Sequence, residues 1–148
     1  MTDNISEVGE FTVTRVLNAP RELVFEVFFD PEQFVQFWGP AGTHTPIESV
    51  VIEGWAGGRF ENTMVADDGS GEFPMQATFV EVVAPERFTF EVTDGIVSTS
   101  TFTDLGDGRT EMTIHQRNVP MAFLTPENQA GFGTSLDRFE SYLELVRR

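Results

Sequence analysis

Residues 18–40 read NAPRELVFEVFFDPEQFVQFWGP, and this stretch predicts two short helices joined by a sharp corner. Pro20 suits the first position of a helix, where no backbone N–H is needed. Asp30-Pro31 is a second start signal, with the aspartate as N-cap and Gln33 placed to reach back toward it. Gly39-Pro40 then ends the second helix.

The two predicted helices are rich in aromatic side chains. Apolar residues of the first recur with a spacing that places them on one face. Five aromatic residues fall within eleven positions of the stretch: Phe28, Phe29, Phe34, Phe37 and Trp38. These side chains need a large apolar partner, which the rest of the chain must supply.

The sequence on both sides of this stretch predicts strands. Apolar and polar residues alternate, and turn-forming segments such as Asp67–Gly71 separate the runs. The expected strands are residues 10–17, 47–52, 59–66, 73–83, 87–92, 97–103 and 109–117. Strands joined in sequence by hairpins form an antiparallel sheet.

A long helix is predicted from about Pro126 to Arg147, with Thr125 as its N-cap. Its apolar residues form one continuous stripe: Phe132, Leu136, Phe139, Leu143 and Val146. Gly131 and Gly133 lie near its start and weaken it. Two explanations are open for these glycines: close packing on a strand, or room for a ligand beneath the first turn.

These elements predict an α+β fold. A curved antiparallel sheet of about seven strands wraps around the long C-terminal helix, and the two short helices close one end. Such a sheet tends to leave a cavity beside the helix. We expect residues 1–9 to be flexible and residues 10–148 to form a single domain.

The composition limits the possible partners. The chain has 148 residues, with 24 acidic against nine basic residues and a net charge of −15. This charge repels phosphate backbones and anionic lipid, so we expect neither nucleic acid nor a membrane as a partner. Two explanations of the acidity are open: solubility, including in a salty cytoplasm, and an acidic docking face.

Several kinds of chemistry are excluded by missing residue types. The sequence has no cysteine and no lysine, which rules out thiol nucleophiles, thiolate metal sites and Schiff bases on a lysine. We find neither a secretory leader nor an apolar run long enough to span a membrane, and we expect a cytoplasmic protein. No pattern indicates a cofactor or a metal.

Five segments, taken in order, carry a resemblance to a known family. They are APRELVFEVFFDPEQFVQFWGP at 19–40, GGRFENTM at 57–64, FVEVVAPERFTF at 79–90, GDGRTEMTI at 106–114 and GFGTSLDRFESYL at 131–143. Together they resemble bacterial proteins similar to the C-terminal domain of activators of the Hsp90 ATPase. That family is part of the START-like helix-grip superfamily, which also contains the major birch pollen allergen and polyketide cyclases.

The resemblance implies a seven-stranded helix-grip fold with an apolar cavity between the sheet and the last helix. Members of the superfamily bind small hydrophobic molecules or act as cyclases, and the family name implies a chaperone as a possible protein partner. In the chaperone activators a separate N-terminal domain makes much of the chaperone contact, and this chain is a single unit.

Strand alternation and the helical stripe predict which side chains line the cavity. The expected ligand-binding residues are Trp38, His44, Trp55, Phe60, Asn62, Met64, Met75, Phe90, Met112, Ile114, Phe132, Leu136 and Phe139. Trp38, His44 and Trp55 are expected at the mouth. The amide of Asn62 requires a hydrogen-bond partner, which could be a ligand oxygen, water or the backbone. Ordinary core packing is the alternative for all these residues.

Three hypotheses of function follow. The first is binding of a small hydrophobic or aromatic molecule in the cavity. The second is an interaction module for a chaperone or another protein. The third is a cyclase- or hydrolase-like enzyme that uses His44 or Glu53 for acid–base chemistry, with exposed loop positions as the alternative for both. The sequence is compatible with a monomer or a homodimer.

Overall fold

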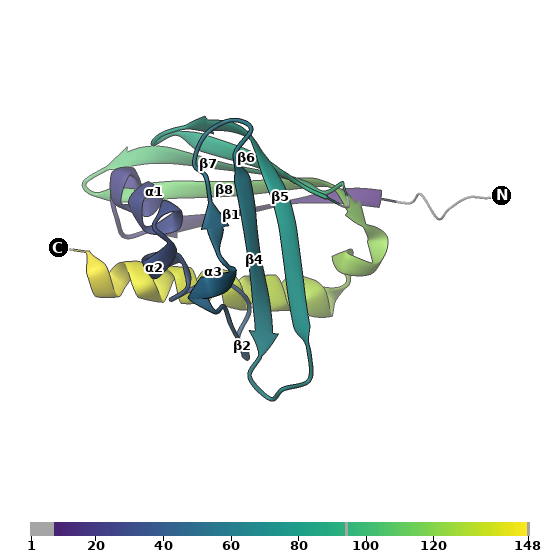
Figure 1. Cartoon of the computed structure of the whole chain (residues 1–148). Helices are drawn as coiled ribbons and strands as arrows, with labels where there is room; N and C mark the ends of the chain where they lie inside the picture. The colour runs from purple at the N-terminus through teal and green to yellow at the C-terminus, as the bar shows by residue number, and fades with distance from the viewer. Residues whose placement is uncertain (1–7, 94, 148) are drawn as a thin grey trace.

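A curved antiparallel sheet arches over a long C-terminal helix in the computed structural model, which describes residues 8–93 and 95–147 (Figure 1). The elements, in order, are β1 (Val8–Leu17), α1 (Arg21–Phe29), α2 (Pro31–Phe34), β2 (Thr43–His44), the 3-10 turn η2 (Ile47–Ser49), β3 (Val51–Ile52), β4 (Arg59–Ala66), β5 (Glu72–Val83), β6 (Arg87–Val92), β7 (Val97–Gly106), β8 (Arg109–Pro120), the 3-10 turn η3 (Met121–Leu124) and α3 (Pro126–Val146). The predicted α+β helix-grip fold is confirmed.

The sheet has eight strands in the order β1-β8-β7-β6-β5-β4-β2, and β3 also pairs with β4. The additional strand is β2, in which Thr43 pairs with Ala66. The strand predicted at 47–52 was wrong in its first half. Ser49 N donates to Pro46 O at 3.0 Å and closes a 3-10 turn, Ser49 Oγ donates to the same oxygen at 2.7 Å, and only Val51 and Ile52 pair with β4.

The sheet begins earlier in the chain than predicted. Val8 is paired with Pro120 and Gly9 with Val119, so these two residues are part of β1 and not of a flexible segment. Residues 1–7, for which flexibility was also predicted, lie outside the described residues. Since β1 lies beside β8, the first and last strands of the chain are neighbours.

The corner between α1 and α2 forms as the sequence predicts. Asp30 Oδ1 accepts a hydrogen bond from Glu32 N at 3.1 Å, and Gln33 Nε2 donates to Asp30 Oδ2 at 3.1 Å. The predicted second helix is shorter than expected and ends at Phe34. The residues after Phe34 form a turn, in which Phe37 N donates to Phe34 O, three residues back.

α3 packs beneath the sheet along its apolar stripe. Leu136, Phe139 and Leu143 are buried, and Thr125 caps the helix by accepting a hydrogen bond from Asn128 N at 3.2 Å. Arg15 on β1 bonds to Asp137 at 2.9 Å and Glu140 at 2.6 Å. The hydrogen bond with Glu140 is the largest cause of a raised pKa for Arg15, against the opposing effect of burial.

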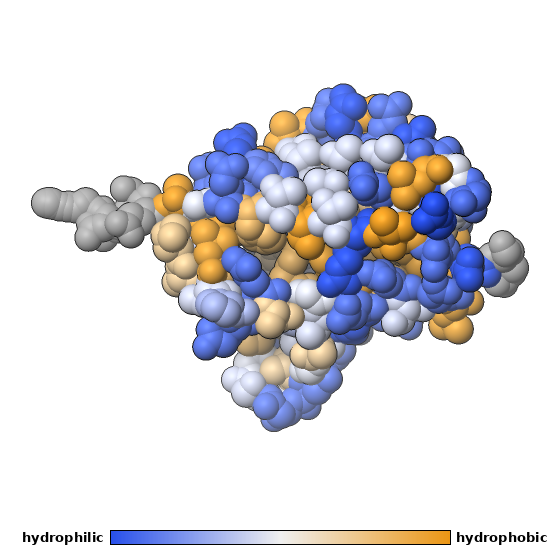
Figure 2. All heavy atoms as spheres, turned by 180° about the vertical axis from the view of Figure 1, so that it is seen from behind, coloured by the Kyte–Doolittle hydropathy of each residue, from blue (hydrophilic) through white to orange (hydrophobic). Residues whose placement is uncertain are grey.

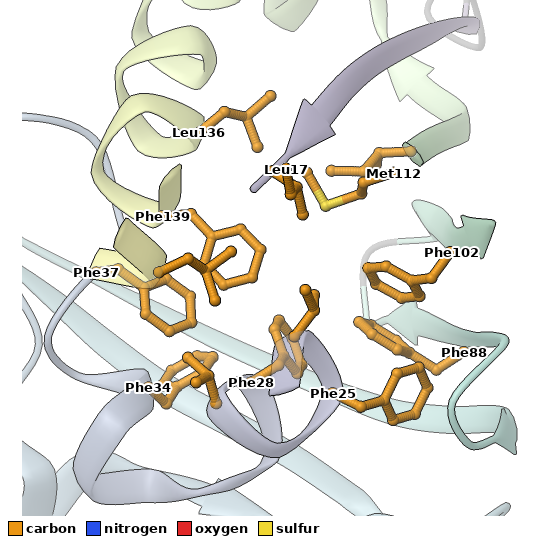
Figure 3. Packing of buried hydrophobic residues seen from close by; sticks show 14 of the residues in the cluster. Leu17, Phe25, Phe28, Phe34, Phe37, Phe88, Phe102, Met112, Leu136 and Phe139 are labelled. Atoms are coloured by element: carbon orange, nitrogen blue, oxygen red, sulfur yellow. The ribbon is translucent and has the colours of Figure 1, made fainter. Parts of the chain in front are cut away.

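Phenylalanine rings fill the end of the fold where α1 and α2 lie (Figure 3). Phe28 of α1 lies 4.6 Å from Phe88 of the sheet, measured between ring centroids. Phe37 lies 4.5 Å from Phe139 of α3, which joins the short helices to the long one. Within the described part of the chain, no helix is both long and apolar enough to cross a membrane.

Candidate functional site

The concave face of the sheet and α3 enclose a cavity of about 370 Å³. Its wall on the sheet side consists of Phe11, Met64, Phe88, Phe90, Ser98, Ser100, Phe102, Met112, Ile114, Gln116 and Val119. The helices, turns and loops contribute Phe28, Phe37, Trp38, Gly39, Pro40, Phe123, Asn128, Gln129, Gly131, Phe132, Ser135, Leu136 and Phe139. Figure 3 shows Leu136 and Phe139 facing Phe102 and Met112 across this space.

The first turns of α3 leave open space next to Gly131. Gly131 lines the cavity, and a Cβ built on it would meet no atom within 4 Å. Gly133 is close only to the side chain of Arg15, whose Nη2 would be 3.7 Å from such a Cβ. Close packing therefore does not explain Gly131, whereas room in the cavity does.

The cavity opens toward η3 and the start of α3. Phe123 is 50% exposed, and Asn128 and Gln129 are also exposed, although all three line the cavity. The half-exposed Val8 and Met121 lie at the same end, since β1 begins beside the end of β8. Hydrophobic spheres are visible next to the grey N-terminal residues in Figure 2.

Many of the predicted ligand-binding residues lie together in the wall. They are Trp38, Met64, Phe90, Met112, Ile114, Phe132, Leu136 and Phe139. Strand parity and the helical stripe placed these side chains on inner faces, and the fold brings those faces together. Their role in binding stays a prediction.

Two residues predicted at the mouth lie elsewhere. His44 is exposed on β2, and its Nδ1 lies 2.6 Å from Asp67 Oδ1 on the outside of the molecule. Trp55 is 61% exposed in the tight connection between β3 and β4. Neither residue lines the cavity, whose exposed lining residues lie in η3 and at the start of α3.

Phe60, Asn62 and Met75 were also placed in the wall, and this was wrong. Phe60 and Asn62 point inward but are covered by the segment around α2. Phe60 is fully buried with its ring centroid 5.6 Å from that of Phe34, and Trp38 Nε1 donates to Asn62 Oδ1 at 2.9 Å. Met75 is partly buried against the core. Among the described residues, Asn62 Nδ2 has no acceptor.

Glu53 has a structural role in its loop. Its Oε1 accepts a hydrogen bond from Arg59 N at 2.9 Å, and its backbone oxygen would lie 2.1 Å from a Cβ on Gly58. The carboxylate thus closes the β3–β4 connection and does not line the cavity. The acid–base hypothesis placed His44 or Glu53 beside the cavity, and the structure removes that basis for both.

The sequence reasoning missed a polar part of the wall. Ser98 and Ser100 on β7 and Gln116 on β8 line the cavity, and Gln116 Nε2 donates to Ser98 Oγ at 3.2 Å. The signal was the alternation in residues 97–102, VSTSTF, where the serines share a face with Phe102. Small polar residues are common on exposed faces, so this pattern alone did not indicate an inner wall.

The loop after α2 is held to α3 by one arginine. Arg138 Nη1 lies 2.8 Å from Gly39 O, 3.2 Å from Pro40 O and 3.3 Å from Thr43 O. Thr134 Oγ1 accepts a hydrogen bond from Ala41 N at 3.0 Å. These contacts hold Gly39 and Pro40 in the cavity wall.

The wall of the cavity is uncharged and mostly apolar. Within residues 8–93 and 95–147, no charged side chain lines the cavity, and no group of three or more His, Asp or Glu side chains could hold a metal ion. Aromatic and aliphatic surfaces predominate, with a few hydroxyl and amide groups. Such a wall suits apolar molecules that carry a small number of polar atoms.

Comparisons with known proteins agree with this architecture. A model of the family described as activator of Hsp90 ATPase homolog 1-like protein matches residues 18–144. A search of curated proteins found no match. Among solved structures, the AHSA1-like protein from Aeromonas hydrophila is 27% identical, with a TM-score of 0.80 and 93% of each chain covered.

Two further structures extend the comparison. A protein from Chromobacterium violaceum is 26% identical, with a TM-score of 0.80, and the match covers 92% of this chain and 98% of that one. An AHSA1 protein from Silicibacter pomeroyi is 19% identical with a TM-score of 0.76, over 92% of this chain and 98% of that one. At that lower identity the likeness concerns the fold alone.

Proposed function

The chain belongs to the family of activator of Hsp90 ATPase homolog 1-like proteins, and we propose that it binds a small hydrophobic or aromatic molecule in the cavity between the sheet and α3. The observation that carries the proposal is the cavity itself. Its volume of about 370 Å³ falls within the range of roughly 300–1,000 Å³ typical of ligand pockets. A chain with 15 phenylalanines has the side-chain volume to fill its interior, yet this space remains.

The composition of the wall supports the same proposal. Phenylalanine rings line several sides, so a flat apolar molecule can contact ring faces and edges. Met64 and Met112 add flexible, polarizable side chains that adapt to ligands of different shape. The mouth near Phe123 gives a path for entry.

Fluorescence titration with N-phenyl-1-naphthylamine tests the proposal. This uncharged dye becomes brighter in apolar sites, and we expect saturable binding with one molecule per chain. Ser100→Leu places a larger side chain in the cavity and should weaken binding by about tenfold, because it occupies ligand space. Thr101→Leu on the same strand is the control: Thr101 is exposed on the opposite face, and binding should be unchanged.

Absence of saturable binding to the wild-type chain, or equal loss in both variants, would contradict a ligand site in this cavity. Native mass spectrometry of the protein purified from its own host provides an independent measurement. We expect an additional mass from a copurified small molecule, which Ser100→Leu should reduce and Thr101→Leu should not.

Interaction with a chaperone of the Hsp90 type is a second candidate function, favoured by the family and by one surface feature. Val8, Met121 and Phe123 are each 50% exposed at the mouth end, on a chain with a net charge of −15. Exposed apolar residues with charged surroundings are typical of protein contacts. A pull-down with Hsp90 from the same host should retain the chain at low salt and lose it with Phe123→Ser; no retention at low salt would reject this function.

A further inference from the structure

Two serines interrupt the aromatic part of the sheet wall. Ser98 lies between Phe90 and Gln116 in the sheet, and Ser100 lies between Phe88 and Ile114. Only 2% of Ser98 and 6% of Ser100 is exposed, and both line the cavity. Both residues are therefore buried, and they place hydroxyl groups on a mostly apolar surface.

The two hydroxyl groups differ in their hydrogen bonds. Ser98 Oγ accepts a hydrogen bond from Gln116 Nε2 at 3.2 Å. The described residues give Ser100 Oγ no hydrogen bond, but it is not one of the fully enclosed polar atoms that lack a partner, which are Arg21 Nε and Asn62 Nδ2. Buried hydroxyl groups elsewhere in the fold are paired, as Thr110 is with Ala19 O at 2.7 Å. Because Ser100 lines the cavity, its hydroxyl is a group to which a ligand there can form a hydrogen bond.

The charge of the site limits the ligand further. No charged side chain from the described residues lines the cavity, so a charged ligand would lose its hydration without gaining a counter-ion. The net charge of −15 adds a long-range repulsion against anions. Carboxylates and phosphates are consequently poor ligands for this cavity.

We infer that the ligand is an uncharged aromatic or apolar molecule with one hydroxyl or carbonyl oxygen, and that this oxygen hydrogen-bonds to Ser100. A serine hydroxyl both donates and accepts, so either kind of oxygen fits. The Ser98–Gln116 pair lies beside it on the next positions of the same wall. The inference rests on the proposed function, because it names the class of molecule that the cavity takes.

Competition between three molecules with one ring system tests this inference. Naphthalene, 2-naphthol and 2-naphthoate are titrated against bound N-phenyl-1-naphthylamine at neutral pH. We expect 2-naphthol to bind about three- to tenfold more tightly than naphthalene, as one added hydrogen bond provides, and 2-naphthoate to compete most weakly.

Variants then assign the hydrogen bond to one residue. In Ser100→Ala the ratio between the naphthol and naphthalene affinities should fall to about one, whereas Ser100→Thr, which keeps the hydroxyl, should retain most of it. Thr101→Ala on the outer face is the matched control and should leave the ratio as in the wild type. Thermal unfolding of each variant establishes that it is folded.

The outcomes separate this inference from the proposed function. Tight binding of the dye with equal affinities for naphthalene and 2-naphthol, or a ratio unchanged by Ser100→Ala, would overturn the role of Ser100 and leave the cavity as a ligand site. Preferred binding of 2-naphthoate would overturn the requirement for an uncharged ligand. If neither the dye nor any naphthalene derivative binds, the proposed function fails and this inference with it.

Discussion

The two ends of the concave face carry similar side chains but differ in what covers them. At the end near α1 and α2, Phe34 and Phe60 are fully buried, and rings from the short helices pack between the sheet and α3. At the end near η3, Phe11 and Phe132 meet edge to face at 5.5 Å, but only the first turns of α3 lie over the sheet. Rings fill most of the first end, where Phe28, Phe37 and Trp38 form one boundary of the cavity, and the cavity extends from there toward η3.

This difference teaches that the covering elements, and not the number of phenylalanines, decide where space remains. The short helices contribute Phe25, Phe28 and Phe34 to the interior, whereas the start of α3 contributes Gly131. One inner surface can thus serve stability at one end and binding at the other. The predictions below test that division.

The largest effect is expected at the filled end. Phe34→Ala removes a fully buried ring that contacts Phe28, Trp38 and Phe60, and we expect the free energy of unfolding to fall by about 3–5 kcal/mol. Phe123→Ala at the mouth removes a half-exposed ring and should cost less than about 1 kcal/mol. Urea denaturation measures both, and similar losses would contradict the division between the two ends.

The stability of the loop after α2 should depend on Arg138. Arg138→Ala removes the donor shared by the carbonyl groups of Gly39, Pro40 and Thr43, and we expect a loss of about 2 kcal/mol. Arg138→Lys keeps the charge but presents fewer fixed donors, so an intermediate loss should result. Hydrogen exchange at the amide of Ala41 should become faster in Arg138→Ala, and an unchanged rate would show that the loop is held by other contacts.

A smaller effect of opposite sign is expected at the open end. Gly131→Ala should raise the free energy of unfolding by up to about 1 kcal/mol, since alanine favours a helix and the added methyl meets no atom. Gly58→Ala is the contrasting variant, because its Cβ would lie 2.1 Å from Glu53 O and should destabilise the loop. A loss of stability in Gly131→Ala would mean that the first turns of α3 are packed more tightly than the cavity implies.

The smallest effect concerns the outer face of the sheet. Hydrogen bonds from Arg59 lower the pKa of Glu61 below its usual 4.5, so the folded state favours the ionised carboxylate. The resulting stabilisation is present above pH 4.5 and is lost as the pH falls through the lowered folded-state pKa. Because the pair is exposed, salt should weaken the effect further.

Urea midpoints between about pH 7 and about pH 3 measure this contribution. Glu61→Gln should be slightly less stable than the wild type at neutral pH, and the difference should vanish at the acidic end. A difference that grows on acidification would have the wrong sign for a lowered pKa.

Local signals in the sequence predicted most of the fold. The caps at Asp30 and Thr125 form as expected, because capping depends on a few neighbouring atoms. Strands β4 and β6 have the predicted bounds, since alternation and turns set them directly. One error falls where local patterns compete: within residues 47–52 the backbone of Ile47–Ser49 forms a 3-10 turn, which the Ser49 hydroxyl supports by donating to Pro46 O.

The candidate site was predictable only in part, and the reason is geometric. Strand parity identified Met112 and Ile114 as inward residues, and both line the cavity. Parity also placed Asn62 inward, but the indole of Trp38 covers it, and Trp38 Nε1 donates a hydrogen bond to Asn62 Oδ1. Parity gives the face of a strand, and it does not say which part of that face another element covers.

By itself, the sequence determined most of the helices and strands and the face that each turns inward. It also determined the acidic character of the chain, which has 24 acidic residues against nine arginines and no lysine. Tertiary structure alone decided that the mouth lies at η3, that Arg138 fixes the loop after α2, and that Ser100 is buried in the wall. The physical reason is the separation along the sequence over which each interaction acts. Capping, periodicity and turns act over a few residues, whereas a cavity is the space that elements distant in sequence fail to fill.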